Sequence, residues 1–507
     1  MAETTHLLLC TFLCILFAAI LLKLKLWTTT AKAFFSRPRT NTNLPPGPWA
    51  LPVIGSIHCL LGSGLLPHHA MRRLSRRYGP VMLLRLGEVR MLVVSSPEGA
   101  MEVVKTHDVA FATRAVTPTS RILSYGARDI IFAPFGRHLG RELRKLCALE
   151  LLSARRVRSF RHVREEEAAR LVRSVAAAAT ASSPAVVNVS ELVKIAANDI
   201  IMRAMIGDRC PQREEYLEAL DMAMDLLAGF NLVDLFPGSW LARLLPVRWP
   251  IPTRREAGHG IKDSTVVGAR HGGDVGVHHG HDDCEDILDV MLRFQREGGL
   301  GITLTEEIVS AVLIFLLLAR RLHQQAMSEF MSPHVMERAQ SEIRRVLQGK
   351  TMISEVDTEG KLHYLQLVIK ETLRLHMPFL MPRLCSEPNI KINGGTTVLV
   401  NVSAISRDEN IWKDANEFRP ERFENDTFDL GFTPGSVGRR MCPGLTFGIY
   451  NLKIILAGLL YHFDWNLPNG TGIYELDMTE TYGVTAHRRT ELLLKATPDS
   501  TPSNQNS

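Results

Sequence analysis

The sequence predicts a mainly α-helical catalytic body with a minor β region, preceded by one N-terminal transmembrane helix. An uncharged apolar run opens the chain, long segments repeat apolar residues every three or four positions, and only a few short stretches have the composition of strands. The 507 residues are 46% apolar and 22% charged, which is typical of a folded protein with a large core.

The first segment, residues 1–27, is expected to be a membrane anchor. The run from Leu7 to Leu22 carries no charge, and the chains of Lys23 and Lys25 can reach the interface, which extends the apolar span to Trp27. Positive charges follow this run and do not precede it. This order favours an uncleaved anchor over the alternative of a signal peptide, and it keeps the body in the cytosol.

The remaining chain divides by composition. Residues 28–48 form a basic linker that ends in a proline-rich hinge at 44–48, where fixed φ angles stiffen the backbone. Residues 49–500 are expected to be the catalytic domain and 501–507 a disordered tail. Within the domain, 257–283 is rich in Gly, His and Asp without apolar periodicity, which favours a mobile loop over a metal site.

The β region is expected in a few short pieces. Val81–Leu86 and Arg90–Ser95 flank a Gly-Glu-Val turn and predict a hairpin, and further strands are expected at Thr397–Val400 and Glu491–Leu494. Helical periodicity covers four long segments. These are residues 137–179, 190–227, 305–348 and 362–376.

Charge and cysteine content exclude other classes of protein. The net charge of +6 is small for this length and the basic residues are spread out, so no nucleic-acid partner is expected. The eight cysteines show no CxxC spacing, so neither a structural zinc site nor a disulfide framework is predicted.

One cysteine stands in a distinctive loop. The sequence Gly-Arg-Arg-Met-Cys-Pro-Gly spans Gly438 to Gly444 and precedes an apolar run. A cysteine in a Gly-rich loop that enters a helix has its thiolate stabilised by backbone N–H groups and the helix dipole, which suits a metal ligand. Pro443 is expected just inside the helix. Taken alone, Cys442 would be better interpreted as a buried structural cysteine beside a turn.

The loop resembles the haem-binding signature of the cytochrome P-450 family, and three other motifs of that family occur in the expected order. Lys370–Arg374 resembles the ExxR helix, Phe418–Phe423 the PERF segment and Pro45–Pro48 the proline hinge. The likeness covers essentially the whole chain and is closest to the plant microsomal A-type group. It implies the cytochrome P-450 fold and haem b as cofactor.

The resemblance also implies roles for single residues. Cys442 would be the axial thiolate ligand of the haem iron, pushing electron density onto the metal. Gly438 would belong to the cofactor-binding loop. Arg440, Arg383 and Arg141 would be the cationic partners of the haem propionates, because a guanidinium matches a carboxylate.

Three further residues are implied to be structural. Glu371 and Arg374 lie one helical turn apart and would pair with each other and with Arg422 to brace the core beside the haem. The alternative for such a pair is a solvated surface contact.

The sequence departs from the family on the distal side. The stretch Leu313–Gln325 contains no glycine, acid or threonine, so the expected acid and threonine that relay protons are absent and no catalytic residue is identified. Gly435 stands in place of a phenylalanine near the thiolate, and Gly140 in place of a tryptophan. We hypothesise that the distal-helix and His-rich stretches arose from reading-frame or splice-boundary errors.

The implied function is a monooxygenase, an oxidoreductase that hydroxylates a small apolar plant secondary metabolite, with a terpenoid-like substrate favoured. The reaction would use dioxygen and electrons supplied by NADPH-cytochrome P-450 reductase. The enzyme would be a single-pass protein of the endoplasmic reticulum membrane with a cytosolic catalytic domain. Two alternatives remain. One is a haem enzyme of the isomerase or dehydratase type that does not activate O2, and the other is an inactive, degenerate or mis-spliced family member.

Overall fold

A computed structural model describes most of the chain after the N-terminal region. The chain divides into two compact units, Met1–Pro45 and Pro46–Ser507, and the elements below belong to the second. The anchor and the His-rich and C-terminal stretches predicted at 1–27, 257–283 and 501–507 lie outside the described residues. The structure describes residues 44–499 apart from 63, 182–185, 210–212, 228–229, 245–284, 318–326, 330–331, 377–381, 387–394, 425–437, 469–475 and 482–486.

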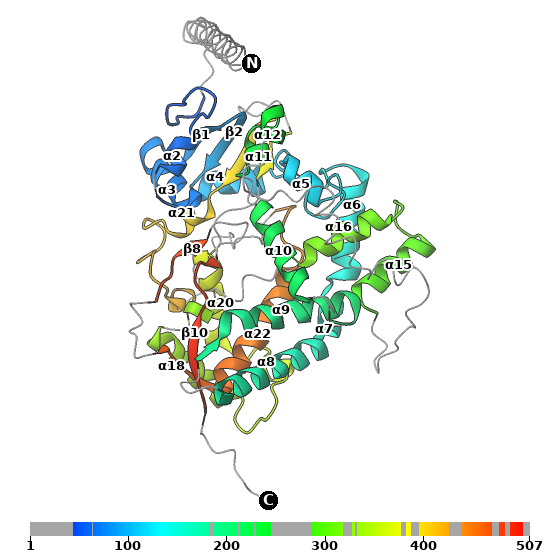
Figure 1. Cartoon of the computed structure of the whole chain (residues 1–507), viewed down its shortest axis with the longest axis vertical. Helices are drawn as coiled ribbons and strands as arrows, with labels where there is room; N and C mark the ends of the chain where they lie inside the picture. Colours follow the sequence, from blue (N-terminus) through cyan, green and yellow to red (C-terminus); the bar gives the residue numbers. More distant parts are fainter. Residues whose placement is uncertain are drawn as a thin grey trace, which may run out of the picture. The chain divides into compact units, whose positions relative to one another are not determined.

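Helices dominate the second unit, as predicted (Figure 1). The α-helices are α2 (Ile57–Leu61), α3 (Pro67–Tyr78), α4 (Pro97–Met101), α5 (Pro118–Leu123), α6 (His138–Leu146), α7 (Ala154–Ser159), α8 (Arg161–Ala181), α9 (Val189–Ile206), α10 (Arg213–Leu227), α11 (Leu232–Leu235), α12 (Trp240–Leu244), α15 (Ile287–Glu297), α16 (Glu306–Leu317), α18 (Pro333–Val346), α19 (Glu355–Thr358), α20 (His363–His376), α21 (Val402–Ser406) and α22 (Leu445–His462). Short π-helical turns are η1 (Glu102–Thr106) and η2 (Cys147–Leu151), and η4 (Pro420–Phe423) is a 3-10 turn.

The strands form small sheets. The largest has the order β1-β2-β6-β5-β3, a second has the order β4-β10-β7, and β8 pairs with β9. Their bounds are β1 (Val81–Leu86), β2 (Val89–Val94), β3 (Thr113–Arg114), β4 (Val186–Asn188), β5 (Arg383–Leu384), β6 (Thr397–Val400), β7 (Phe463–Asn466), β8 (Glu480–Thr481), β9 (His487–Arg488) and β10 (Leu493–Pro498).

The predicted hairpin is confirmed, with Val81 opposite Val94 and Leu86 opposite Val89. Its turn places Gly87 at φ +63°, a conformation that glycine adopts without strain. The strand at Thr397–Val400 is also confirmed. The last predicted strand begins later than expected, at Leu493, because the preceding Leu492 is buried and its N–H donates to the Ser190 hydroxyl (2.8 Å).

Two long predicted helical segments are interrupted at capping residues. The segment 137–179 contains α6, η2, α7 and α8, and Ser153 starts α7 by accepting a hydrogen bond from the Arg156 N–H (3.3 Å). The segment 190–227 breaks at Gly207, which ends α9 at φ +77°. Periodicity identified the helical faces here, whereas single capping residues set the boundaries.

Helix α22 lies in the core of the second unit. It packs against α8, α9, α18 and α20 (Figure 1). Among the described residues it is the one helix long and apolar enough to cross a membrane, but most of that length is buried against protein, as expected for a core helix. Since Cys442 precedes α22 directly, the core fixes the position of the cysteine loop.

Candidate functional site

The loop before α22 holds Cys442 at the entrance of the helix. The backbone N–H groups of Gly444 and Leu445 lie close enough to the cysteine sulfur to lower its pKa, and the Leu445 N–H also donates to the Cys442 carbonyl (3.4 Å). Burial raises the pKa of the Cys442 thiol, while these N–H groups and the charges of Arg144 and Arg114 oppose that shift. The prediction for Pro443 was wrong: α22 begins at Leu445 with Gly444 as its N-cap, because the loop backbone stays irregular around the sulfur.

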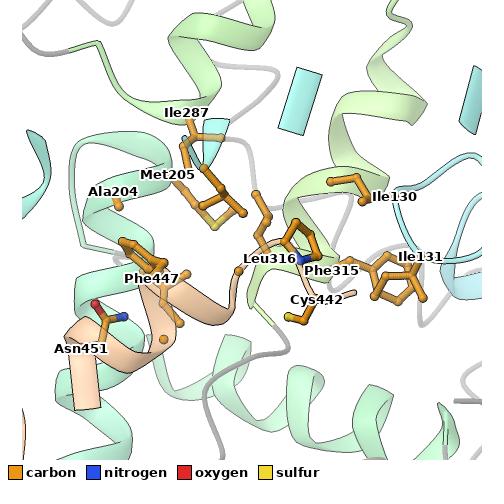
Figure 2. A pocket seen from close by; sticks show the side chains of 15 residues that line it. Ile130, Ile131, Ala204, Met205, Ile287, Phe315, Leu316, Cys442, Phe447 and Asn451 are labelled. Carbon is orange, nitrogen blue, oxygen red and sulfur yellow. The ribbon is translucent and has the colours of Figure 1, made fainter. Parts of the chain in front are cut away.

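Cys442 lies in the wall of an apolar cavity (Figure 2). The space between protein atoms amounts to about 720 Å³, including its open mouth. Cys442 is accessible to solvent, and it lines this cavity, so its accessible surface faces the cavity. The lining residues come from the loop after α5, the residue that follows η2, the cysteine loop and α9, α15, α16 and α22; among them are Ile130, Leu152, Met205, Ile287, Phe315 and Phe447.

Arg440 is buried within the cysteine loop. Its guanidinium donates to the carbonyls of Ala112 (2.6 Å), Ile130 and Ile131 (both 3.3 Å) and Ala133. Burial lowers the Arg440 pKa to about 10, with the charges of Arg144 and Arg383 acting in the same direction. The side chain therefore anchors the cysteine loop to residues 112–133. One N–H of its Nη2 group stays available for a further hydrogen-bond acceptor.

Arg383, also predicted, faces a second arginine across a strand pair. Strands β3 and β5 are antiparallel, and Arg114 stands directly opposite Arg383. Like charges in this register repel each other. Burial lowers the pKa of Arg383 to about 10, and its Nε has no hydrogen-bond partner among the described residues. Such an orphaned buried donor, beside a second cation, indicates a site for an anion.

Arg144, and not the predicted Arg141, contacts the cysteine loop. Arg144 Nη2 donates to the Met441 carbonyl (2.9 Å), and its charge acts on Cys442. Arg141 is exposed, and its Nη2 donates a hydrogen bond to the Gly136 carbonyl (3.4 Å). The helical period explains the difference, because the buried face of α6 runs through Gly140, Leu143 and Leu146, and Arg144 borders it.

The arginines around Cys442 form a buried or half-buried positive group. Arg114 is partly buried, and burial lowers its pKa well below the usual value; Arg383, Arg440 and Arg144 lower it further. Burying several like charges close together is costly. A cofactor that carries two carboxylates beside its metal, as haem does, would neutralise this group next to the thiolate. The donor set and the orphaned Arg383 Nε therefore fit haem.

Gly438 is required by close packing. It adopts φ +79°, and a Cβ atom on it would lie 2.3 Å from the Val104 carbonyl oxygen of η1. Any side chain would push the cysteine loop away from η1. A glycine at the start of this loop therefore controls where the loop sits.

The structure brings Glu371, Arg374 and Arg422 together. Arg374 Nε and Nη2 each donate to one Glu371 oxygen (both 2.7 Å), and Arg422 Nε donates to the same carboxylate at 3.0 Å. Glu371 and Arg374 are buried, so this is not the solvated surface pair considered as an alternative. Arg374 also donates to the carbonyls of Ala415 (2.9 Å) and Ser406, which links α20 to the chain that leads into η4.

Comparison with known proteins decides the family. The sequence model of the cytochrome P-450 family matches residues 45–316 and 330–494. The chain belongs to the cytochrome P-450 family. It is 43% identical to an ent-cassadiene hydroxylase of Oryza sativa subsp. japonica, covering 92% of this chain and 94% of the relative. A dolabradiene monooxygenase of Zea mays is 43% identical (90% and 92% covered), and a costunolide synthase of Cichorium intybus 41% (90% and 93%).

The P-450 fold is found independently by structure. A zebra fish cytochrome P-450 determined with abiraterone superposes with a TM-score of 0.68 at 22% sequence identity, covering 85% of this chain and all of that one. Predictions of a P-450 fold, of a haem cofactor with a cysteine thiolate and of a monooxygenase are thereby confirmed. The interval between the two matched ranges, 317–329, overlaps the stretch Leu313–Gln325 that departs from the family.

Proposed function

We propose that this P-450 hydroxylates a small terpenoid-like metabolite at the endoplasmic reticulum membrane, with Cys442 as the axial ligand of its haem iron. The observation that carries the proposal is the placement of Cys442 in an apolar cavity next to Arg114, Arg144, Arg383 and Arg440. Haem, when bound, supplies the site at which dioxygen is held and activated.

The chain's own residues hold and tune the cofactor in this proposal. The N–H groups of Gly444 and Leu445 stabilise the Cys442 thiolate, which burial alone would disfavour. Arg383 and Arg114 offer their guanidiniums to the propionates from one face of a strand pair. Arg440 anchors the cysteine loop and donates its remaining Nη2 N–H to a haem propionate. Glu371, Arg374 and Arg422 are structural braces.

Several relatives are named for terpenoid chemistry, which supports the proposed substrate class. Ent-cassadiene hydroxylase and dolabradiene monooxygenase carry hydrocarbon names, and costunolide synthase makes costunolide. The cavity supports this class as well, since Ile131, Ile201, Met205, Phe315 and other apolar side chains form most of its wall. Such a wall excludes water and accepts a hydrocarbon skeleton.

The proposed membrane location rests on the apolar run at residues 1–27 and on an exposed apolar surface. The β1–β2 turn links two apolar segments: the Gly87 N–H donates to the Ile54 carbonyl (3.2 Å), and the Glu88 N–H donates to the Leu235 carbonyl (2.9 Å). Large apolar side chains near these segments are exposed; they are Trp49, Val53, Leu61, Trp240 and Leu241. We infer that this surface contacts the bilayer and that NADPH-cytochrome P-450 reductase supplies electrons from the cytosolic side.

Product analysis with labelled dioxygen tests the function. Microsomes containing the full-length chain and the reductase would be given ent-cassadiene or dolabradiene with NADPH under 18O2. A product that gains one labelled oxygen atom, and that is lost in Cys442→Ala, is expected. If the parent protein binds haem with a thiolate-type spectrum but oxidises no terpenoid hydrocarbon, the proposed substrate class is wrong.

A further inference from the structure

A second cluster of metal-binding side chains lies where α3 meets the β8–β9 pair. His68 and His69 stand in the first turn of α3, directly after Pro67, and Glu480 begins β8. None of the three lines the cavity at Cys442. His68 Nε2 lies 3.2 Å and His69 Nε2 3.6 Å from the same Glu480 oxygen, Oε2. All three ligand atoms lie within 4.8 Å of one another.

These separations match the geometry of a tetrahedral metal centre. Zinc binds histidine nitrogen and carboxylate oxygen at about 2.0–2.2 Å, so two ligand atoms of one tetrahedral ion stand about 3.3 Å apart. Both contacts between a histidine nitrogen and Glu480 Oε2 fall near that value. Side-chain motion of a few tenths of an ångström would bring the three atoms around one ion.

Residues behind the cluster fix the carboxylate in place. The other Glu480 oxygen, Oε1, accepts from His376 Nδ1 (3.3 Å), and His376 Nε2 donates to Glu329 Oε1 (2.6 Å). His376 is buried between these two carboxylates. Hydrogen bonds of this kind orient metal-ligating carboxylates.

Access to the cluster comes from His69. Its side chain is 31% exposed, whereas His68 (2%) and Glu480 (9%) are nearly enclosed. An ion could therefore enter past His69 and keep a water ligand on that side. Three further charged or titratable side chains face the cluster: Glu329, His376 and Arg407. The negative charges of Glu329 and Glu480 are therefore offset by nearby positive groups. This balance favours moderate affinity over the tight binding of thiolate-rich sites.

We propose that His68, His69 and Glu480 bind a divalent transition-metal ion of the zinc class, independently of the haem. Two imidazoles and one carboxylate suit zinc and its neighbours better than calcium or magnesium, which prefer all-oxygen sites. The ion would join α3 to β8 and, through His376, to the end of α20. Its role is structural.

Zinc uptake by the holoenzyme tests the site. The His-rich stretch could bind zinc by itself, so all variants carry His→Gln changes at His259, His271, His278, His279 and His281, and no histidine tag is used. Each protein is stripped with chelator and dialysed against Zn²⁺, and bound zinc is measured per haem iron. One zinc per haem is expected in this background. His69→Gln should lose it, because two ligands bind much more weakly than three.

A matched control separates this site from general histidine binding. His107 forms an exposed pair with Glu102 (3.3 Å) and has no second histidine in that contact, so His107→Gln should retain the zinc. An unchanged reduced, carbon monoxide-bound spectrum confirms that each variant is folded. Equal zinc in the background protein and its His69→Gln variant, or no zinc in either, would overturn the proposal.

Discussion

The substitution Glu371→Gln should destabilise the protein strongly although it changes only one charge. Four donors converge on the Glu371 carboxylate, two from Arg374, one from Arg422 Nε and one from the Arg419 backbone N–H. Three of them use Oε1, so the best glutamine rotamer keeps its oxygen there and turns its NH2 group toward Arg374 Nε. At least one charged donor then loses its acceptor.

The expected cost follows from that geometry. A buried hydrogen bond to a charged group contributes about 1.5–3 kcal/mol. Removing one member of a buried ion pair costs about 3–5 kcal/mol in total, because the remaining charge is no longer neutralised. We therefore expect Glu371→Gln to lower the free energy of unfolding by about 3–5 kcal/mol, observed as an earlier loss of the haem Soret band in a urea titration.

An exposed ion pair gives the matched control. Arg128 and Glu307 contact each other at 2.6 Å, but their side chains are 49% and 58% exposed. Arg128→Ala should therefore cost less than about 1 kcal/mol. If Glu371→Gln costs no more than Arg128→Ala, the ExxR pair does not brace the core and the reasoning is refuted.

Three further predictions concern the cysteine loop and its surroundings. Gly438→Ala should reduce the haem content of purified protein severalfold, since its Cβ would lie 2.3 Å from the Val104 carbonyl oxygen; full retention would contradict the packing argument. Arg144→Ala should weaken haem binding more than Arg141→Ala in a haem-transfer assay, and the reverse order would support the role that the sequence predicts for Arg141. Burial raises the pKa of Asp129 from 3.8 to about 7. Stability should therefore fall as pH rises through this range, because the folded state keeps a proton that the unfolded chain releases, and Asp129→Asn should flatten this dependence in denaturation midpoints.

Local patterns in the sequence identified much of the fold. Alternating and β-branched residues located β1 and β6, and apolar periodicity located α20 almost to the residue, because these elements bury one face or both. The ends of α6, α7 and α9 were not predicted. They depend on Ser153 and Gly207, whose effect comes from one hydrogen bond or one backbone angle.

The candidate site was predicted where residues belong to a continuous motif and missed where they come from separate elements. Cys442, Gly438 and Arg440 share one loop. Arg114 was missed because its place beside Cys442 depends on the register of β3 with β5, strands separated by most of the chain. Arg144 could have been found from the sequence. The helical period of α6 places it on the same side as Gly140, nearer to the buried face than Arg141, which makes it the better candidate for a contact with the cysteine loop.

The reduced, carbon monoxide-bound absorption spectrum tests the central claim most directly. The full-length protein should show the Soret band of a thiolate-ligated haem, and Cys442→Ala should abolish that band without abolishing folding as judged by circular dichroism. A thiolate-type band that survives in Cys442→Ala, or its absence from a folded and haem-loaded parent protein, would contradict the assignment of Cys442 as the iron ligand.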